Sequence, residues 1–133
     1  MIFYNNIDIE FITGNCKFHA INLVCSPIMH NIPFHSHGKN CYEIHYISEG
    51  DGILNAGGKK YAITPNTLFV TGPLVSHSQI TDLNSPMFEW CVYLRTDESG
   101  TEKYSDIISR FLSEKFWIGQ DGQGLLPLFQ KLF

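Results

Sequence analysis

The sequence predicts a mainly β protein, a sandwich or barrel of short strands followed by C-terminal helices. Runs of alternating apolar and polar residues, bounded by Gly, Asn or Pro, fill roughly the first hundred residues. After "RTDESG" (95–100) the apolar spacing changes from two to about 3.6 residues, the helical period. The chain has 133 residues, 44% hydrophobic and 17% charged, which indicates one folded domain and excludes a disordered tail.

About nine short strands are expected. The first three are the alternating run around Ile7–Phe11, the run Lys17–Cys25 and the run Cys41–Ser48. The turn at Glu49–Gly52 and the dipeptide Gly57-Gly58 predict two consecutive hairpins, because glycine adopts a positive φ at little cost.

The last predicted strands lie on either side of Gly72-Pro73 and in "MFEWCVYL" (87–94). Since alternate residues of a strand share a face, the last run has one apolar face, made by Phe88, Trp90, Val92 and Leu94. Its opposite face carries Glu89, Cys91 and Tyr93, and Tyr93 is predicted to line a pocket.

Two helices are predicted after the strands. The first has an apolar stripe that begins at Tyr104 and extends to Phe116, with Ser99 and Glu102 spaced as a capping box. The second is "LLPLFQKLF" (125–133), where Pro127 is tolerable in the first turn. It ends abruptly on apolar residues, so the chain is expected to be a domain taken from a longer protein. The expected division is a barrel at 1–98 and a helical linker or dimerisation segment at 99–133.

Composition restricts partners and location. The formal net charge is -4, and the adjacent pair Lys59-Lys60 is the one such basic pair, so this segment lacks the basic stripe that phosphate contacts require. No apolar run approaches the roughly 20 residues that span a membrane, and the first residues lack an export signal. We therefore expect a cytoplasmic protein whose four cysteines are free thiols.

Several ionisable side chains gather in "PFHSHGKNCYEIHYISEG" (33–50). His35 and His37 are two residues apart, and Glu43 and His45 share one face of the next strand. Such groups in a dry core would cost several kcal/mol each unless they were paired or solvated, so they predict a wet pocket. Three interpretations of the two histidines remain open: exposed or structurally satisfied side chains, pocket lining without metal, and metal ligands.

The segment "HSHGKNCYEIHYISEG" resembles the first cupin motif, in which HxH is followed by Glu and then, after six residues, by Gly, as Glu43 and Gly50 are here. His77 in "PLVSH" stands where the second motif offers a histidine. The resemblance implies a cupin-like β-barrel, or jelly roll. It also implies a metal set of His35, His37, Glu43 and His77 that would suit zinc, iron, manganese or nickel.

Residues from about 30 to 95 more closely resemble the N-terminal effector-binding domain of AraC-type transcription regulators. This resemblance rests on "FHSHGKNCYEIHYISEGDG" through "GGKKYAITPNTLFVTGPLVSHS". It implies a small-molecule effector, a homodimer, and contact with DNA through a C-terminal helix-turn-helix domain outside this chain. It also implies that the inward positions contact effector, often without metal. The expected ligand-binding residues are His35, His37, Glu43, His45, His77 and Tyr93.

Three functions follow as hypotheses. The first is a regulatory sensor, without catalytic residues, that binds a small effector such as a sugar and modulates the DNA-binding domain. The second is a metal-dependent cupin enzyme, an isomerase or dioxygenase. The third is a dimerisation module with an empty or collapsed pocket.

Overall fold

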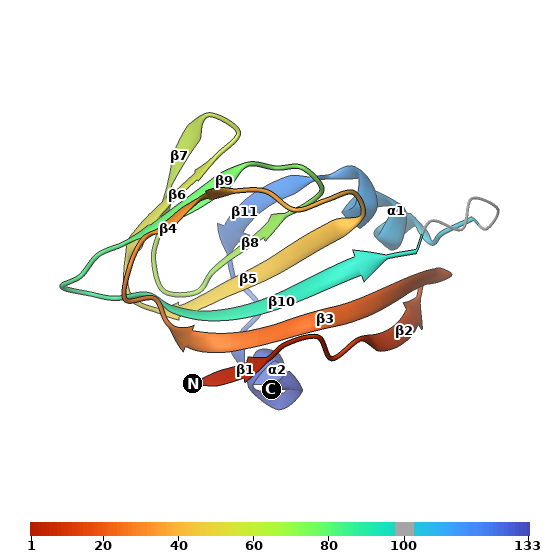
Figure 1. Cartoon of the computed structure of the whole chain (residues 1–133), viewed down its shortest axis with the longest axis horizontal. Coiled ribbons are helices and arrows are strands. Elements are labelled where there is room, and N and C mark those ends of the chain that lie inside the picture. The colour runs from red at the N-terminus through yellow and green to blue at the C-terminus, as the bar shows by residue number, and fades with distance from the viewer. Residues whose placement is uncertain (98–102) are drawn as a thin grey trace.

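Two antiparallel β-sheets face each other in this computed structural model, which describes residues 1–97 and 103–133 (Figure 1). The larger sheet has the strand order β1-β3-β10-β5-β8-β11, and β2 also pairs with β3. Its strands are β1 (Ile2–Tyr4), β2 (Ile9–Thr13), β3 (Cys16–Pro27), β5 (Cys41–Glu49), β8 (Thr67–Thr71), β10 (Phe88–Thr96) and β11 (Phe116–Gln120). The smaller sheet has the order β4-β9-β6-β7. Its strands are β4 (Ile32–His35), β6 (Gly52–Ala56), β7 (Lys59–Ile63) and β9 (His77–Thr81).

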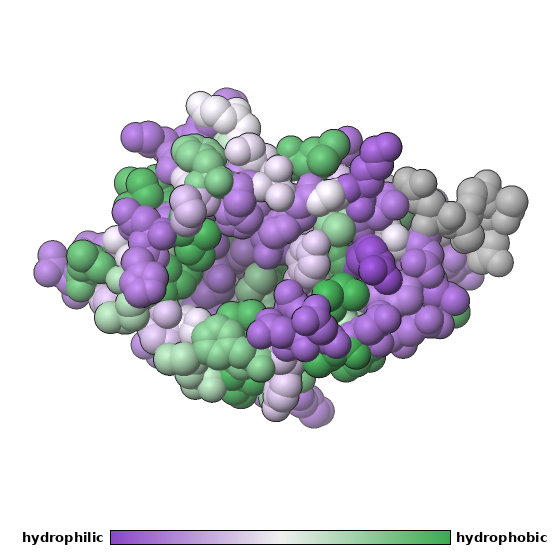
Figure 2. Space-filling model, in the orientation of Figure 1, coloured by the Kyte–Doolittle hydropathy of each residue, from purple (hydrophilic) through white to green (hydrophobic). Residues whose placement is uncertain are grey.

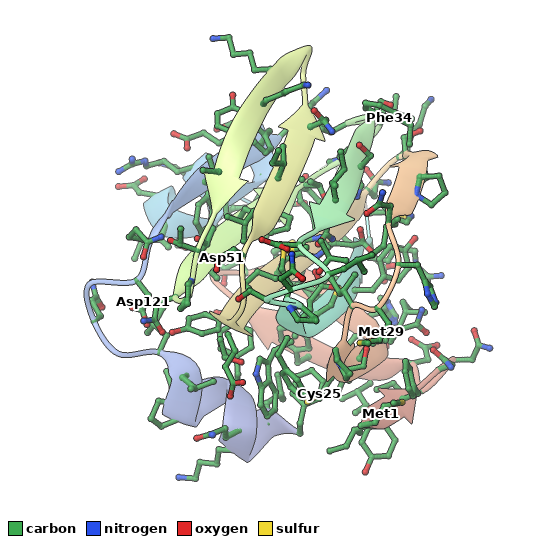
Figure 3. The ribbon with its side chains drawn as sticks, turned by 90° about the vertical axis from the view of Figure 1, so that its left-hand side faces the viewer. Met1, Cys25, Met29, Phe34, Asp51 and Asp121 are labelled. Carbon is green, nitrogen blue, oxygen red and sulfur yellow. The ribbon has the colours of Figure 1, made fainter. Side chains whose placement is uncertain are left out.

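The chain passes from the larger sheet to the smaller one at two of the predicted turns, Glu49–Gly52 and Gly72-Pro73. These crossings make the fold a jelly roll. The predicted hairpin at Glu49–Gly52 is wrong, because β5 lies in the larger sheet and β6 in the smaller one. Gly50 makes this crossing with φ +81°, and a Cβ there would overlap the backbone of Pro86. Asp51 completes it, since its N–H donates to the carbonyl of Ser85 over 2.9 Å (Figure 3). The second hairpin is confirmed, because β6 pairs with β7 across Gly57-Gly58.

Apolar side chains form two clusters, one on each face of the larger sheet. The cluster between the sheets consists of Ile28, Ile47, Leu54, Ala56, Ile63, Phe69 and Met87. The cluster on the outer face includes Phe18, Leu23, Tyr42, Val70, Val92 and Leu94 and is packed against both helices. The predicted alternation of β10 is therefore confirmed, with Val92 and Leu94 outward and Glu89 and Cys91 buried on the other face.

Helix α1 (Asp106–Ser113) confirms the predicted helix after the strands, but it is shorter than the predicted stripe. Ser105 is its N-cap, and its hydroxyl accepts a hydrogen bond from the N–H of Ile108. The predicted capping box at Ser99 and Glu102 lies outside the described residues. Phe116, predicted as the end of the helical stripe, instead begins β11.

Strand β11 was not predicted, because its residues lie in the segment expected to be a helical linker. It pairs with β8 from Phe116↔Thr71 to Gln120↔Thr67. Its side chains alternate as a strand requires, since Phe116 and Ile118 contact the inner cluster and Trp117 contacts the outer one. The division of the chain at residue 98 remains a prediction.

Helix α2 (Leu126–Leu132) lies beside the outer face of the larger sheet, with Pro127 in its first turn as predicted. Asp121 fixes the approach to this helix (Figure 3). Its Oδ2 accepts hydrogen bonds from the Leu125 N–H and from the Tyr46 hydroxyl, the latter over 3.0 Å. The helix is thereby tied to β5. Neither described helix is long and apolar enough to cross a membrane.

Candidate functional site

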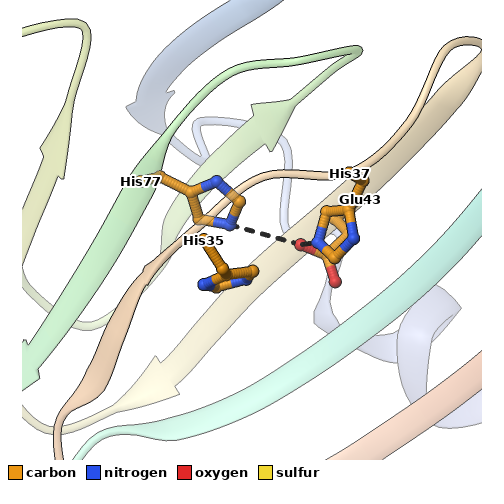
Figure 4. A group of neighbouring side chains, drawn as sticks. All are labelled: His35, His37, Glu43 and His77. Atoms are coloured by element: carbon orange, nitrogen blue, oxygen red, sulfur yellow. Dashed lines mark ion pairs between the residues drawn. The ribbon is translucent and has the colours of Figure 1, made fainter.

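Four predicted ligand residues meet between the two sheets (Figure 4). His35 ends β4 and lies directly across from His77, the first residue of β9. His37 follows β4, and Glu43 projects from β5. The ring centroids of His35 and His77 are 4.2 Å apart, and those of His35 and His37 are 5.1 Å apart. The jelly-roll crossings therefore assemble residues that are up to 42 positions apart, from His35 to His77.

Imidazole nitrogens surround one oxygen of Glu43. Its Oε2 lies 2.8 Å from Nε2 of His37 and 3.3 Å from Nε2 of His77. These three atoms are buried, yet among the described residues none has a hydrogen-bond partner in acceptable geometry. The short separations are therefore close approaches of polar atoms that face a common point, and such atoms require a proton, a polar ligand or a cation between them.

Backbone carbonyls set the orientation of two of the histidines. Nδ1 of His35 is 2.8 Å from the carbonyl of Pro33, and Nδ1 of His77 is 2.9 Å from the carbonyl of Val75. A carbonyl can only accept, so each Nδ1 carries the proton. In the neutral imidazole the lone pair is then on Nε2, the arrangement that metal-binding histidines adopt.

His45 lies deeper than His37 and Glu43 and is nearly as buried as His77. Its side chain is 3% exposed, whereas those of His37 and Glu43 are 22% and 14% exposed, so the site is open to solvent at the His37 end. The Nδ1 of His45 is 2.9 Å from Oε2 of Glu89, which also accepts a 3.0 Å hydrogen bond from the Gln79 amide. Its ring stacks on Phe69 at 4.3 Å.

The electrostatics favour a carboxylate at Glu43. Burial acts to raise the pKa of Glu43, but contact with His37, His45 and His77 outweighs burial and holds this pKa well below its usual range. Burial opposes the charged form of His45, yet Cys91 and Glu89 raise its pKa well above the ordinary value. Negative charge at Glu43 and positive charge at His45 thus support one another in the interior.

Tyr93 completes the predicted set. It lies across from Glu43 in the β10–β5 register, and its ring is 5.0 Å from the ring of His37. Burial raises the pKa of its hydroxyl, which stays a neutral donor and acceptor at physiological pH. The structure thus places Tyr93 and His45 beside the four candidate metal ligands.

The residues fit a divalent transition metal. Three imidazole nitrogens and one carboxylate oxygen, from His35, His37, His77 and Glu43, lie within 4.8 Å of one another. Nitrogen and oxygen donors in this number suit zinc, iron, manganese or nickel. The observation that supports this fit is that three buried atoms of the set have no hydrogen-bond partner within residues 1–97 and 103–133.

Glu89 and Gln79 were not predicted as site residues. Both are buried, and both contact the interior network through Oε2 of Glu89. The strand period places Glu89 on the Tyr93 face and Gln79 two residues after His77, but it does not show that the two side chains meet. His19 and His30 do not appear in the metal groupings found among the described residues, and His19 bridges Asp8 and Asp97. All four cysteines are free.

Two facing sheets that cross into each other, with an imidazole and carboxylate cluster between them, define a cupin-like jelly-roll domain with C-terminal helices, as predicted. The sheets are not joined into one closed barrel within the described residues. The chain belongs to the AraC-like ligand binding domain family, whose profile matches residues 26–133. The domain is thus of a ligand-binding, regulatory class.

Solved structures similar to the chain include YhaK from Escherichia coli, with 8% identity and a TM-score of 0.55 over 92% of this chain and 52% of that chain. A protein from Bacillus halodurans has 15% identity and a TM-score of 0.50 over 77% of this chain and 80% of that chain. A cupin protein from Bacteroides fragilis has 20% identity and a TM-score of 0.48 over 74% and 85% of the two chains. At these identities the likeness concerns the fold, and the chain spans about half the length of YhaK. No curated protein matches the sequence.

Proposed function

We propose that this domain is the sensor of an AraC-type transcription regulator and that a small effector binds between the two sheets. The observation that carries the proposal is the convergence of His35, His37, Glu43 and His77, with buried polar atoms that have no hydrogen-bond partner among the described residues. An effector that supplies those partners would stabilise the domain, because an unpaired buried polar group costs about 1–3 kcal/mol. The match to the ligand-binding family supports the same conclusion.

The chemistry of the site favours a polyhydroxylated effector such as a sugar. Glu43 accepts hydrogen bonds, Tyr93 both donates and accepts, and Oε1 of Gln79 is a buried acceptor without a described partner. Hydroxyl groups can satisfy donors and acceptors alike, whereas an anion would meet the carboxylate of Glu43. The open His37 end of the site is the proposed entrance.

Effector binding can be transmitted along β5. This strand places Glu43 and His45 inside the jelly roll and Tyr46 on the outside, where Tyr46 bonds to Asp121 and its ring lies 5.0 Å from that of Phe129 in α2. A shift of β5 on binding would therefore move the start of α2. In the proposed regulator α2 leads towards a C-terminal helix-turn-helix domain that contacts DNA, and a coupling of about 1–3 kcal/mol would make a useful switch.

A binding experiment tests the proposal. Isothermal calorimetry and thermal shift with a panel of sugars and related polyols are expected to find a saturable ligand for the wild-type chain. The double variant His35→Ala/His37→Ala should lose binding, whereas His30→Ala, which alters an exposed histidine away from the site, should keep it. Equal binding by all three proteins would place the ligand elsewhere and contradict the proposal.

A metal-dependent cupin enzyme is the second candidate. The observation that favours it is the pair of Nδ1 contacts to the carbonyls of Pro33 and Val75, which leave Nε2 of His35 and His77 free to bind a metal. Such a metal would act as a Lewis acid on a bound substrate. About one equivalent of metal in the wild type, lost in the double variant and accompanied by turnover, would favour the enzyme; ligand binding without turnover favours the sensor.

The assembly and location of the protein belong to the same proposal. We place the regulator in the cytoplasm as a homodimer, with residues 99–133 as linker and dimerisation segment. The exposed apolar side chains Leu128 and Leu132 of α2 support a contact there, at 62% and 55% exposure. Sedimentation of the wild type beside a Leu128→Asp/Leu132→Asp variant tests it: a dimer should become monomeric in the variant, and a wild-type monomer would contradict the assignment.

A further inference from the structure

A second group of potential metal ligands adjoins the first and shares Glu43 with it; the ring centroids of His45 and His77 are 6.1 Å apart. Ligand atoms of Glu43, His45 and Cys91 lie within 4.8 Å of one another. His45 and Cys91 are direct partners across the β5–β10 ladder, and Glu43 is two residues from His45 on the same face of β5. Strand register therefore fixes all three side chains in relation to one another.

The ring of His45 is held by Glu89 and Phe69, and Gln79 in turn holds Glu89. Its Nδ1–H donates to the carboxylate of Glu89, Gln79 donates to the same carboxylate oxygen, and the ring stacks on Phe69 with an interplanar angle of 11°. A carboxylate on one imidazole nitrogen orients the other nitrogen for a metal. This support uses two buried residues, Glu89 and Gln79, that neither the outer set nor the apolar cluster employs.

Two oxygens lie near Nε2 of His45, and the one on Thr71 is within hydrogen-bond distance. Nε2 lies 3.4 Å from Oε2 of Glu43 and 3.4 Å from Oγ1 of Thr71, which is directly across from Glu43 on β8. Strong hydrogen bonds between such atoms are about 2.7–3.0 Å long. Nitrogen and oxygen ligands at about 2.0–2.1 Å from a tetrahedral zinc ion are separated from each other by roughly 3.3–3.4 Å. Oε2 of Glu43 is also buried without a hydrogen-bond partner among the described residues.

We infer that Glu43, His45 and Cys91 form an inner binding position for Zn²⁺ or a similar divalent cation, with Thr71 as the neighbouring oxygen. The thiol makes this position softer than the outer set, whose donors are nitrogen and oxygen, and thiolate with imidazole is a donor combination that zinc prefers. On binding, the Cys91 thiol and the protonated His45 ring each lose a proton to solvent, and the sulfur and the His45 Nε2 then donate to the cation. Glu43, shared by both sets, would lie between the two positions. The inference does not depend on the proposed effector.

Cobalt(II) is the probe, because a Co²⁺–thiolate bond absorbs in the near ultraviolet and reports sulfur ligation directly. Metal-free wild type, kept reduced, is titrated with Co²⁺ beside Cys91→Ala, the control Cys25→Ala and His35→Ala/His37→Ala. Cys25 is likewise a buried free thiol, but it belongs to neither group of candidate ligands. The charge-transfer band is expected in the wild type, in the control and in the double histidine variant. It should vanish in Cys91→Ala, with one fewer Co²⁺ bound per chain.

The absence of the thiolate band in the wild type, or its persistence in Cys91→Ala, overturns the inference and leaves a proton between His45 and Glu43 as the bridging species. Should Cys91→Ala fail to fold, X-ray absorption of the zinc-loaded wild type decides: one sulfur at about 2.3 Å supports the inner position, and a shell of nitrogen and oxygen alone refutes it. Effector binding enters neither readout, so failure of the proposed function and failure of this inference are distinguishable.

Discussion

Replacing Glu89 should destabilise the fold, although this residue is outside the apolar clusters. Its side chain is 8% exposed, and its Oε2 accepts from Nδ1 of His45 at 2.9 Å and from the amide of Gln79 at 3.0 Å. In Glu89→Ala both donors would lose their partner in a buried environment. Each unpaired donor costs about 1–3 kcal/mol. The expected loss in the free energy of unfolding is therefore about 3–5 kcal/mol, the range typical of breaking a buried charged pair.

The variant Glu89→Gln distinguishes the contribution of the two hydrogen bonds to stability from the contribution of the negative charge. The amide oxygen of glutamine can occupy the position of Oε2 and accept from both donors, so the loss is limited to the charge assistance of the two bonds, about 1–2 kcal/mol. Urea unfolding of the metal-free protein at pH 7, followed by far-ultraviolet circular dichroism, measures both variants. Glu49→Ala at the exposed end of β5 is the control and should change stability by less than about 0.5 kcal/mol. If Glu89→Ala costs no more than Glu89→Gln, the buried donors do not depend on this carboxylate and the reasoning is refuted.

Three further outcomes are expected. Leu54→Ala, at a fully buried position between the sheets, should lower the free energy of unfolding by about 2–5 kcal/mol in urea titrations, whereas Leu83→Ala, 71% exposed, should leave it nearly unchanged. Gly50→Ala should lower the melting temperature, because the left-handed φ alone costs about 1–2 kcal/mol and the added Cβ overlaps Pro86; an unchanged melt would contradict this. His19→Gln should lower the free energy of unfolding most near pH 5.5. Hydrogen bonds to Asp97 and Asp8 raise the pKa of His19, and the same bond to His19 lowers the pKa of Asp97. This stabilisation is present below the unfolded histidine pKa of about 6.5 and is lost as pH rises through the raised folded value; a difference between His19→Gln and wild type that grows from pH 5.5 to pH 8.5 would refute it.

The strand alternation carried most of the fold prediction, because burial of one face repeats every two residues. It located β5 and β10 and placed Tyr93 opposite the outer apolar face. It could not show which sheet each strand joins. The Glu49–Gly52 turn reads locally as a hairpin, but the close approach of Gly50 to the backbone of Pro86 is a tertiary contact between residues 36 positions apart.

The candidate ligand residues were predicted better than the buried residues that hold them in place. The HxH pattern, Glu43 and His77 are local signals, and the structure brings these residues together. The Glu89–Gln79 pair depends on β9 and β10 meeting across the interior, which the spacing of neither strand reveals. Strand β11 was missed for a related reason: five residues followed by "DGQG" are too short to establish a period, and their pairing with β8 determines their conformation.

The interior of this jelly roll is divided into an apolar part and a polar part, and β5 runs through both. Ile47 on β5 belongs to the apolar cluster with Leu54 and Phe69, whereas Glu43 and His45 on the same face belong to the polar site. The apolar part holds the two sheets together, so the polar part can retain atoms that have no hydrogen-bond partner in the described part of the chain. Because Tyr46 bonds to Asp121 ahead of α2, β5 joins the polar site on one face of the larger sheet to the helix on the other.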